Sequence, residues 1–119
     1  MSLDAIAANV ETLRAEARRR KRDHVVPYMF AVALIRSGVD PTAPEAVEAV
    51  TALRASVAAN ASFAPAHSEL GRLLLKRDDV DGAIAELKQA VRLDADATAA
   101  LYNLAQAYRR KGDRARAAE

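Results

Sequence analysis

The sequence predicts an all-α protein, an α-α superhelix built from helical-hairpin repeats. Its composition favours helix: 51% of the 119 residues are hydrophobic, only 4 are Gly and 4 are Pro, and Ala, Leu and Arg are abundant. Apolar residues recur at steps of three and four, the spacing of amphipathic helices. A shift of 34 positions places Leu70 on Leu104 and Asp79 on Asp113. A fixed period of this length is typical of repeat architectures.

The composition also limits what the protein can be. Its length predicts a single domain over residues 1–119, and its net charge of +2 gives only a slight preference for acidic partners. The chain has no Cys, which excludes disulfides and Cys-based zinc sites. The longest apolar run, Val25–Ile35, is too short to span a bilayer, and the N-terminus does not resemble a signal peptide. We therefore predict a cytoplasmic protein without a membrane span.

Residues 3–23 are predicted to form an N-terminal capping helix. Ser2 is suited to accept a hydrogen bond from the first turn. One apolar stripe runs along the helix and consists of Leu3, Ile6, Val10, Leu13 and Ala17. Such a stripe needs a partner, which is either the next helix pair or, through a short coiled coil, a second copy of the chain.

The densest charge in the chain is the basic run Arg18–Arg22. Such a run can bind nucleic acid or an anionic surface, or it can be the solvated last turn of a helix. Successive helical residues point in all directions, and no aromatic residue is interleaved for base stacking. Nucleic-acid binding is therefore the less favoured interpretation.

Residues 27–61 are predicted to form a degenerate repeat. Pro27 suits the first turn of a helix over 28–37, and Gly38 suits its end. The second helix, Pro44 to about Ala59, carries small and apolar residues at the spacing of the next repeat. The linker 39–45 is longer than its counterpart there. It is either an adaptation to a partner or a neutral surface loop.

Residues 64–97 form the clearest repeat, with helices expected at Pro65–Arg77 and Gly82–Arg92. Asp79 or Asp81 is expected to cap the second helix. The acidic cluster around them lacks the spacing of a calcium loop. His67 falls at a packing position and is predicted to be structural, while His24 has no second His with which to bind a metal.

Residues 98–119 are predicted to form a partial repeat. The helix 97–111 should end at a Gly112–Asp113 turn, with a new helix beginning at Arg114. Its buried stripe is expected to be Leu101, Leu104 and Tyr108. The covering helix is incomplete, and an exposed apolar face of this kind marks an interface or a truncated chain. We predict self-association through these three residues.

Together these residues resemble the tetratricopeptide repeat (TPR) signature W-x2-L-G-x2-Y, A-x3-F, P, most clearly over residues 64–117. The matching positions are His67, Leu70, Gly71, Leu74, Ala83, Leu87, Ala90 and Ala95. His, Leu and Leu replace Trp, Tyr and Phe, and Ala replaces Pro. The resemblance implies about two and a half repeats behind an N-terminal helix, and a scaffold that binds other proteins.

In this family the first helix of each pair lines a concave groove that holds peptides or helices of a partner. Carried over by spacing, the groove residues are Tyr28, Met29, Val32 and Arg36; Ser68, Glu69, Arg72 and Lys76; and Tyr102, Asn103, Gln106 and Arg110. Basic groups among them favour an acidic segment or a C-terminal carboxylate. The Lys/Asn clamp with which some members bind chaperone tails is absent, because Pro65, Ser68 and Arg72 stand in comparable places.

The sequence contains no catalytic constellation. It has no Gly-rich phosphate loop, no H-E-x-x-H and no feasible Ser-His-Asp set, so we predict no enzyme activity, no cofactor and no metal. Three functions remain: binding a protein segment in the groove, self-assembly through the C-terminal face, and binding nucleic acid or an anionic surface through Arg18–Arg22.

Overall fold

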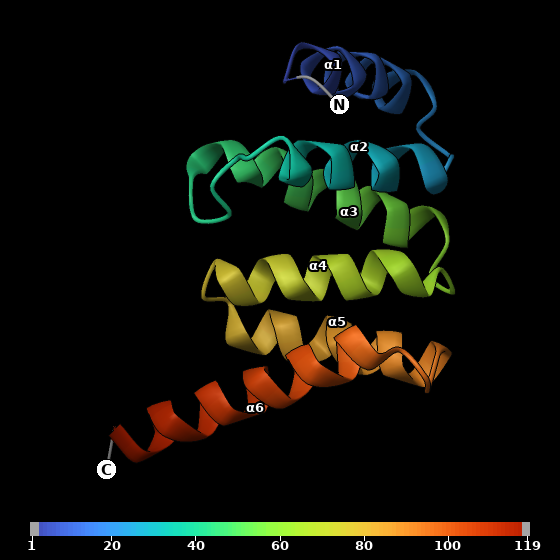
Figure 1. Ribbon diagram of the computed structural model, residues 1–119. Coiled ribbons are helices and arrows are strands. Elements are labelled where there is room, and N and C mark those ends of the chain that lie inside the picture. The colour runs from blue at the N-terminus through green and yellow to red at the C-terminus, as the bar shows by residue number, and fades with distance from the viewer. Residues whose placement is uncertain (1–2, 118–119) are drawn as a thin grey trace.

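The computed structural model describes residues 3–117, and its described part contains only helices, as the fold-class prediction required (Figure 1). The elements in chain order are α1 (Leu3–Arg19), α2 (Val25–Arg36), the short 3-10 helix η1 (Pro44–Ala46), α3 (Val47–Ala59), α4 (Ala64–Lys76), α5 (Val80–Leu93) and α6 (Thr98–Ala117).

The helices form an elongated stack, with α1 at one end and α6 at the other (Figure 1). The molecule extends over 48 × 28 × 23 Å. The most closely packed pair is the α4–α5 hairpin. The α2–α3 hairpin and the α5–α6 pair follow, and each hairpin touches its neighbours in the chain. Successive helices therefore bury their apolar faces on one another, as in a solenoid.

The small and apolar residues that define the repeat register are buried in both hairpins. Phe30, Ala31 and Leu34 of α2 pack with α3, whose register residues Ala49, Leu53 and Ser56 are also buried. In the next hairpin the corresponding buried residues are Leu70, Gly71, Leu74, Ala83, Leu87 and Ala90. Ser56 is the polar member, and its hydroxyl donates to the carbonyl oxygen of His24 at 2.6 Å. Each register position thus packs against the partner helix of its own hairpin.

α1 lies on α2 and is attached to the next hairpin by an ion pair. Arg14 donates two hydrogen bonds to the carboxylate of Glu48, at 3.0 and 2.9 Å, and its guanidinium lies 5.4 Å from the ring centre of Phe30. Val10 is buried beneath it. The side chains of Leu3 and Ile6, and all of Ser2, lie outside the described residues, so that part of the predicted stripe and the predicted cap stay predictions.

The predicted end of the first helix at Asp23 is wrong, because α1 ends at Arg19. Asp23 instead accepts a hydrogen bond from the backbone N–H of Val25 at 2.8 Å. α2 therefore begins at Val25, three residues before the predicted start at Tyr28. The basic run consequently spans the last turn of α1 and the connection that follows.

The predicted turn at Gly112 is also wrong, because α6 continues as one helix to Ala117. Gly112 does not have a positive φ, and no atom would lie within 4 Å of a Cβ added there. A Gly in a helix lowers its stability by only about 1 kcal/mol and does not end it. In the described part of the chain no later helix packs back on α6 to enforce a turn.

The turn between α4 and α5 explains the acidic cluster. The side chain of Asp79 accepts a hydrogen bond from the backbone N–H of Gly82 at 3.0 Å, which decides for Asp79 as the cap. Asp78 has a φ of 70° at the end of α4, and the N–H of Asp79 donates to the carbonyl of Leu74, as in a Schellman cap. These acidic residues therefore shape the turn.

The long linker 39–45 is also held by a structural contact. One guanidinium nitrogen of Arg77 donates to the carbonyl oxygens of Pro41 and Ala43, each at 2.9 Å. The linker is thus fixed on the end of the following hairpin.

Two Gly residues give a matched test of backbone conformation. Gly38 has a φ of +98°, which an Ala side chain disfavours, whereas Gly112 is helical. We expect Gly38→Ala to lower the free energy of unfolding by about 1 kcal/mol and Gly112→Ala to raise it by about 0.5–1 kcal/mol. Urea denaturation measures both. Equal effects of the two changes would contradict the helical path of α6 through Gly112.

Candidate functional site

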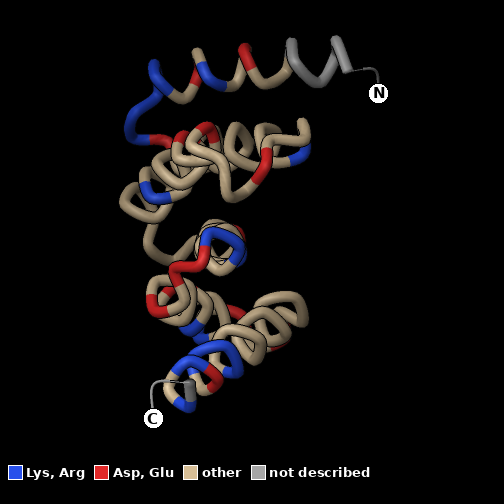
Figure 2. Tube along the Cα trace, turned by 90° about the vertical axis from the view of Figure 1, so that its left-hand side faces the viewer, with Lys and Arg blue, Asp and Glu red and all other residues tan. Residues whose placement is uncertain are grey.

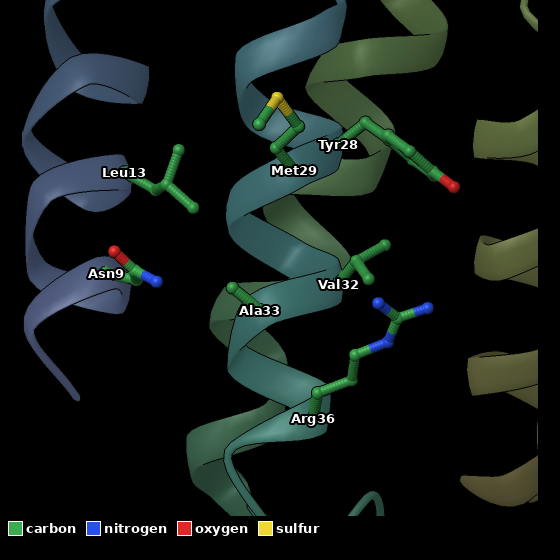
Figure 3. Close-up of a pocket in the computed structure, with 7 residues that line it drawn as sticks. All are labelled: Asn9, Leu13, Tyr28, Met29, Val32, Ala33 and Arg36. Carbon is green, nitrogen blue, oxygen red and sulfur yellow. The ribbon is translucent and has the colours of Figure 1, made fainter. Parts of the chain in front are cut away.

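The first helix of each pair, α2, α4 or α6, carries the residues predicted to line a groove. Beside α2 a cavity of about 490 Å³ opens (Figure 3). The predicted residues that line it are Tyr28, Met29, Val32 and Arg36. Asn9, Leu13 and Ala33 complete the lining.

Figure 3 divides these residues into two groups. Tyr28, Val32 and Arg36 point toward α4, and we call them the α4 side of the cavity. Asn9, Leu13 and Ala33 lie between α1 and α2 and form the α1 side. Met29 lies on α2 between the two groups, and its side chain is 47% exposed.

On the α4 side, charged residues of two helices surround Tyr28. Burial raises the pKa of Tyr28, and the nearby carboxylate of Glu69 raises it further, while Arg36 and Arg72 lower it. The Tyr28 ring meets Phe63 edge-on, with 5.2 Å between ring centres. Arg72 also donates to Glu69 at 2.9 Å. The α4 side thus combines an apolar floor with the guanidinium of Arg36, and Arg72 of α4 lies near enough to influence Tyr28 as well.

The residues predicted for the C-terminal end of the groove are placed differently. Tyr102 is 63% exposed and accepts a hydrogen bond from the side-chain amide of Gln106 at 2.9 Å. Arg110 donates to the carbonyl oxygen of Leu75 at 2.7 Å and so closes the end of α4. Because this contact is structural, Arg110 is a poor position at which to test partner binding. Ser68 and Asn103 are half-buried, and Lys76 is exposed.

The prediction of a buried stripe at Leu101, Leu104 and Tyr108 is wrong for two of its members. Leu101 is 44% and Tyr108 is 48% exposed, and only Leu104 packs partly on the core. The residues by which α6 packs on the core are Ala100 and Ala107, both fully buried. Leu101 and Tyr108 therefore lie on an open apolar face of α6, which nothing among the described residues covers, and the opposite, buried face is formed by small residues.

His67 is buried at 5% exposure, with both ring nitrogens engaged. Nδ1 lies 2.7 Å from a carboxylate oxygen of Glu86, and Nε2 lies 2.7 Å from the carbonyl oxygen of Ala61. The carbonyl only accepts, so Nε2 donates to it. The side chain thus ties α4 to α5 and to the preceding turn. No group of three or more potential metal ligands occurs among the residues that the structure describes.

Figure 2 shows basic residues gathered where α1 ends and along the C-terminal half of α6. Arg19 and Arg20 pair with Glu16. On α6, Lys111 pairs with Asp81 at 2.9 Å, and Arg114 pairs with Asp78. Part of the basic charge therefore holds the fold together. Nucleic-acid binding through Arg18–Arg22 stays a prediction.

The sequence analysis missed the contribution of α1 to the cavity. A usable signal was present, because Leu13 lies 21 residues before Leu34, as Leu53 does before Leu74 and Leu87 before Tyr108. This spacing assigns α1 to the class of second helices, α3 and α5. A second helix packs on the first helix that follows it, which places Asn9 and Leu13 against α2.

Comparison with known proteins identifies the repeat. Residues 71–112 match the family model described as the TPR repeat, over the second half of α4, all of α5 and α6 as far as Gly112. No curated protein matches the chain. In the described range no helix is long and apolar enough to cross a membrane. The predicted resemblance is confirmed, and TPR repeats are scaffolds for protein–protein interaction that are typically not enzymes.

Proposed function

Since the chain carries a TPR repeat, we propose that it binds a segment of a partner protein along the groove formed by its first helices. The observation that supports this most is the α4 side of the cavity. Tyr28 and Val32 supply an apolar floor there, and Arg36 points across it toward α4. Concave sites with an apolar lining and a few directed polar groups are typical of binding sites.

Charge indicates which segment fits. Among the described residues no carboxylate pairs with Arg36, whereas Arg72 already pairs with Glu69 at 2.9 Å. Lys76 extends the basic edge along α4. A guanidinium binds a carboxylate in a two-bond geometry that favours Asp, Glu or a chain terminus. We therefore propose an acidic segment with one apolar side chain that enters the cavity.

The test uses a displayed library of acidic peptides with free and amidated C-termini. We expect the Arg36→Glu, Arg72→Glu double variant to bind the selected peptides about 100-fold more weakly, because two charge-assisted hydrogen bonds become repulsive contacts. Fluorescence titration measures the change, and circular dichroism checks the helix content.

The matched control is Arg54→Glu with Arg92→Glu, which changes the net charge equally at exposed positions on the second helices α3 and α5. It should bind like the wild type. An equal loss of binding in both double variants would show that overall charge, and not the groove, holds the peptide.

A further inference from the structure

We propose that copies of this chain stack head to tail, with α6 of one copy seated on α1 and α2 of the next. In this arrangement α6 and the neighbouring α1 complete a helical hairpin between two molecules. The inference goes beyond the proposed function, because it uses the α1 side of the cavity and not the α4 side.

The acceptor surface is the α1 side. α1 has the register of a second helix and packs on α2 as α3 packs on α4 and α5 on α6. In the α4–α5 hairpin a second helix also packs along the first helix before it. α1 has no such helix among the described residues, and the cavity lies along its Asn9 and Leu13. The acceptor surface is therefore the seat for one first helix.

The donor surface is the open face of α6, which has the register of a first helix. Its residues Leu101, Leu104, Ala105 and Tyr108 correspond to His67, Leu70, Gly71 and Leu74 of α4, 34 positions earlier. All four α4 residues are buried. On α6, Leu101 and Tyr108 are 44% and 48% exposed. The donor surface thus lacks a second helix packed on it, whereas α5 packs on the corresponding face of α4.

The sizes of the facing residues match a pair already present in the protein. In the α4–α5 hairpin Gly71 packs directly against Leu87, and a Cβ added at Gly71 would meet Leu87 Cγ at 2.5 Å. In the α2–α3 hairpin the same two positions hold Ala31 and Leu53, both fully buried. Between molecules they would hold Ala105 and Leu13, the same Ala–Leu combination as in α2–α3.

Neighbouring first helices supply a second contact. Tyr28 of α2 lies close enough to Glu69 of α4 to respond to its charge. The same register places Tyr102 of one copy next to Met29 of the following copy. These side chains are 63% and 47% exposed. A thioether beside an aromatic ring is a favourable contact. Four of the six large apolar residues exposed in the described structure, Met29, Leu101, Tyr102 and Tyr108, would be covered.

Charge supports the antiparallel orientation that a hairpin requires. Asp94 and Asp96 are exposed just before α6, and Arg18, Lys21 and Arg22 are exposed where α1 ends. In an antiparallel pair the beginning of α6 lies beside the end of α1. Opposite charges therefore meet at this edge, and like charges would meet if α6 were reversed.

Because the two surfaces are different, an associated pair keeps one free acceptor on the first copy and one free donor on the second. Such a heterologous contact produces open linear chains unless its rotation closes a ring. The α4 side of each cavity stays uncovered, so partner binding along the groove remains possible in the assembly.

The test blocks one surface at a time in the full chain. Met29→Glu blocks the acceptor, and Leu101→Glu with Tyr108→Glu blocks the donor. All three positions are exposed in the monomer, so the helix content should be unchanged. We expect wild-type mass to rise with concentration in sedimentation velocity, and each blocked variant to associate at least about 30-fold more weakly, since an unpaired carboxylate would be buried.

Mixing the two blocked variants is the decisive measurement. Each keeps one intact surface, so a one-to-one mixture should form a heterodimer and stop there. Val47→Glu is the control, because Val47 is 48% exposed on α3 and outside both surfaces. It should associate like the wild type.

Three results would overturn the proposal. The first is a wild-type chain that stays monomeric at about 1 mM, where contacts worth 4 kcal/mol become visible. The second is a mixture of blocked variants that stays monomeric. The third is self-association of the Met29→Glu variant alone, which would indicate symmetric pairing of two α6 helices.

Discussion

Replacement of Leu87 by Ala is expected to lower the free energy of unfolding by about 3–4 kcal/mol. Leu87 is fully buried in α5 and packs directly against Gly71 of α4. Its removal takes away buried apolar surface and leaves a cavity at the closest point of the hairpin, where the two helix backbones are fixed by small residues. Urea denaturation followed by circular dichroism measures the change.

Gly71→Ala provides the matched control for this contact. Alone it should be destabilising by about 1–3 kcal/mol, because the added Cβ would meet Leu87 Cγ at 2.5 Å. In the Leu87→Ala background this collision is absent, and only the backbone oxygen of Ala83 lies close, 3.3 Å from the added Cβ. The intrinsic helix preference of Ala, about 1 kcal/mol, opposes that contact, so the change should cost clearly less than in the wild type. An equal cost in both backgrounds would show that another contact restricts position 71.

His67→Ala should lower the free energy of unfolding by about 2–4 kcal/mol. The change opens a cavity and leaves the carboxylate of Glu86 and the carbonyl of Ala61 without their 2.7 Å partners. Chemical denaturation again measures it. Glu86→Gln, which keeps a hydrogen-bonding group at that site, should cost less. A His67→Ala variant within 0.5 kcal/mol of wild type, about the effect of an ordinary surface substitution, would contradict a structural role for this side chain.

The two proposed interactions occupy opposite sides of α2 and are separable by mutation. Arg36 belongs to the groove, and Leu13 and Ala33 belong to the surface on which we propose that α6 packs. Met29 lies between them and is the one residue that both surfaces approach. The Arg36→Glu, Arg72→Glu variant should therefore still assemble. The Met29→Glu variant alone does not distinguish assembly from peptide binding, so it is compared with the donor-blocked variant. The substitutions of that variant are on α6, which lies far along the stack from the cavity (Figure 1).

The part of the candidate site on α2 could be predicted from the sequence. The positions that the TPR resemblance assigned to the groove on this helix line the cavity, whereas those it assigned to α4 do not. The α1 side was missed because Asn9 and Leu13 come from a helix without the TPR signature residues, and its one signal is the 21-residue spacing from Leu13 to Leu34. Arg110 was expected in the groove, but its guanidinium donates to the carbonyl oxygen of Leu75 at the end of α4.

The sequence by itself determined the hairpins, the small residues at their crossings and an acidic cap at Asp79 or Asp81, between which the structure chose Asp79. All of these depend on spacing and on groups within a few residues of one another. Only the tertiary structure decided where α1 ends, that α6 continues through Gly112, and which face of α6 is buried. The repeat register predicts which neighbour a residue packs against. Leu101 and Tyr108 are nevertheless exposed, because no described helix covers them. Gly112 likewise stays helical, because a Gly lowers the stability of a helix by only about 1 kcal/mol and does not by itself end it.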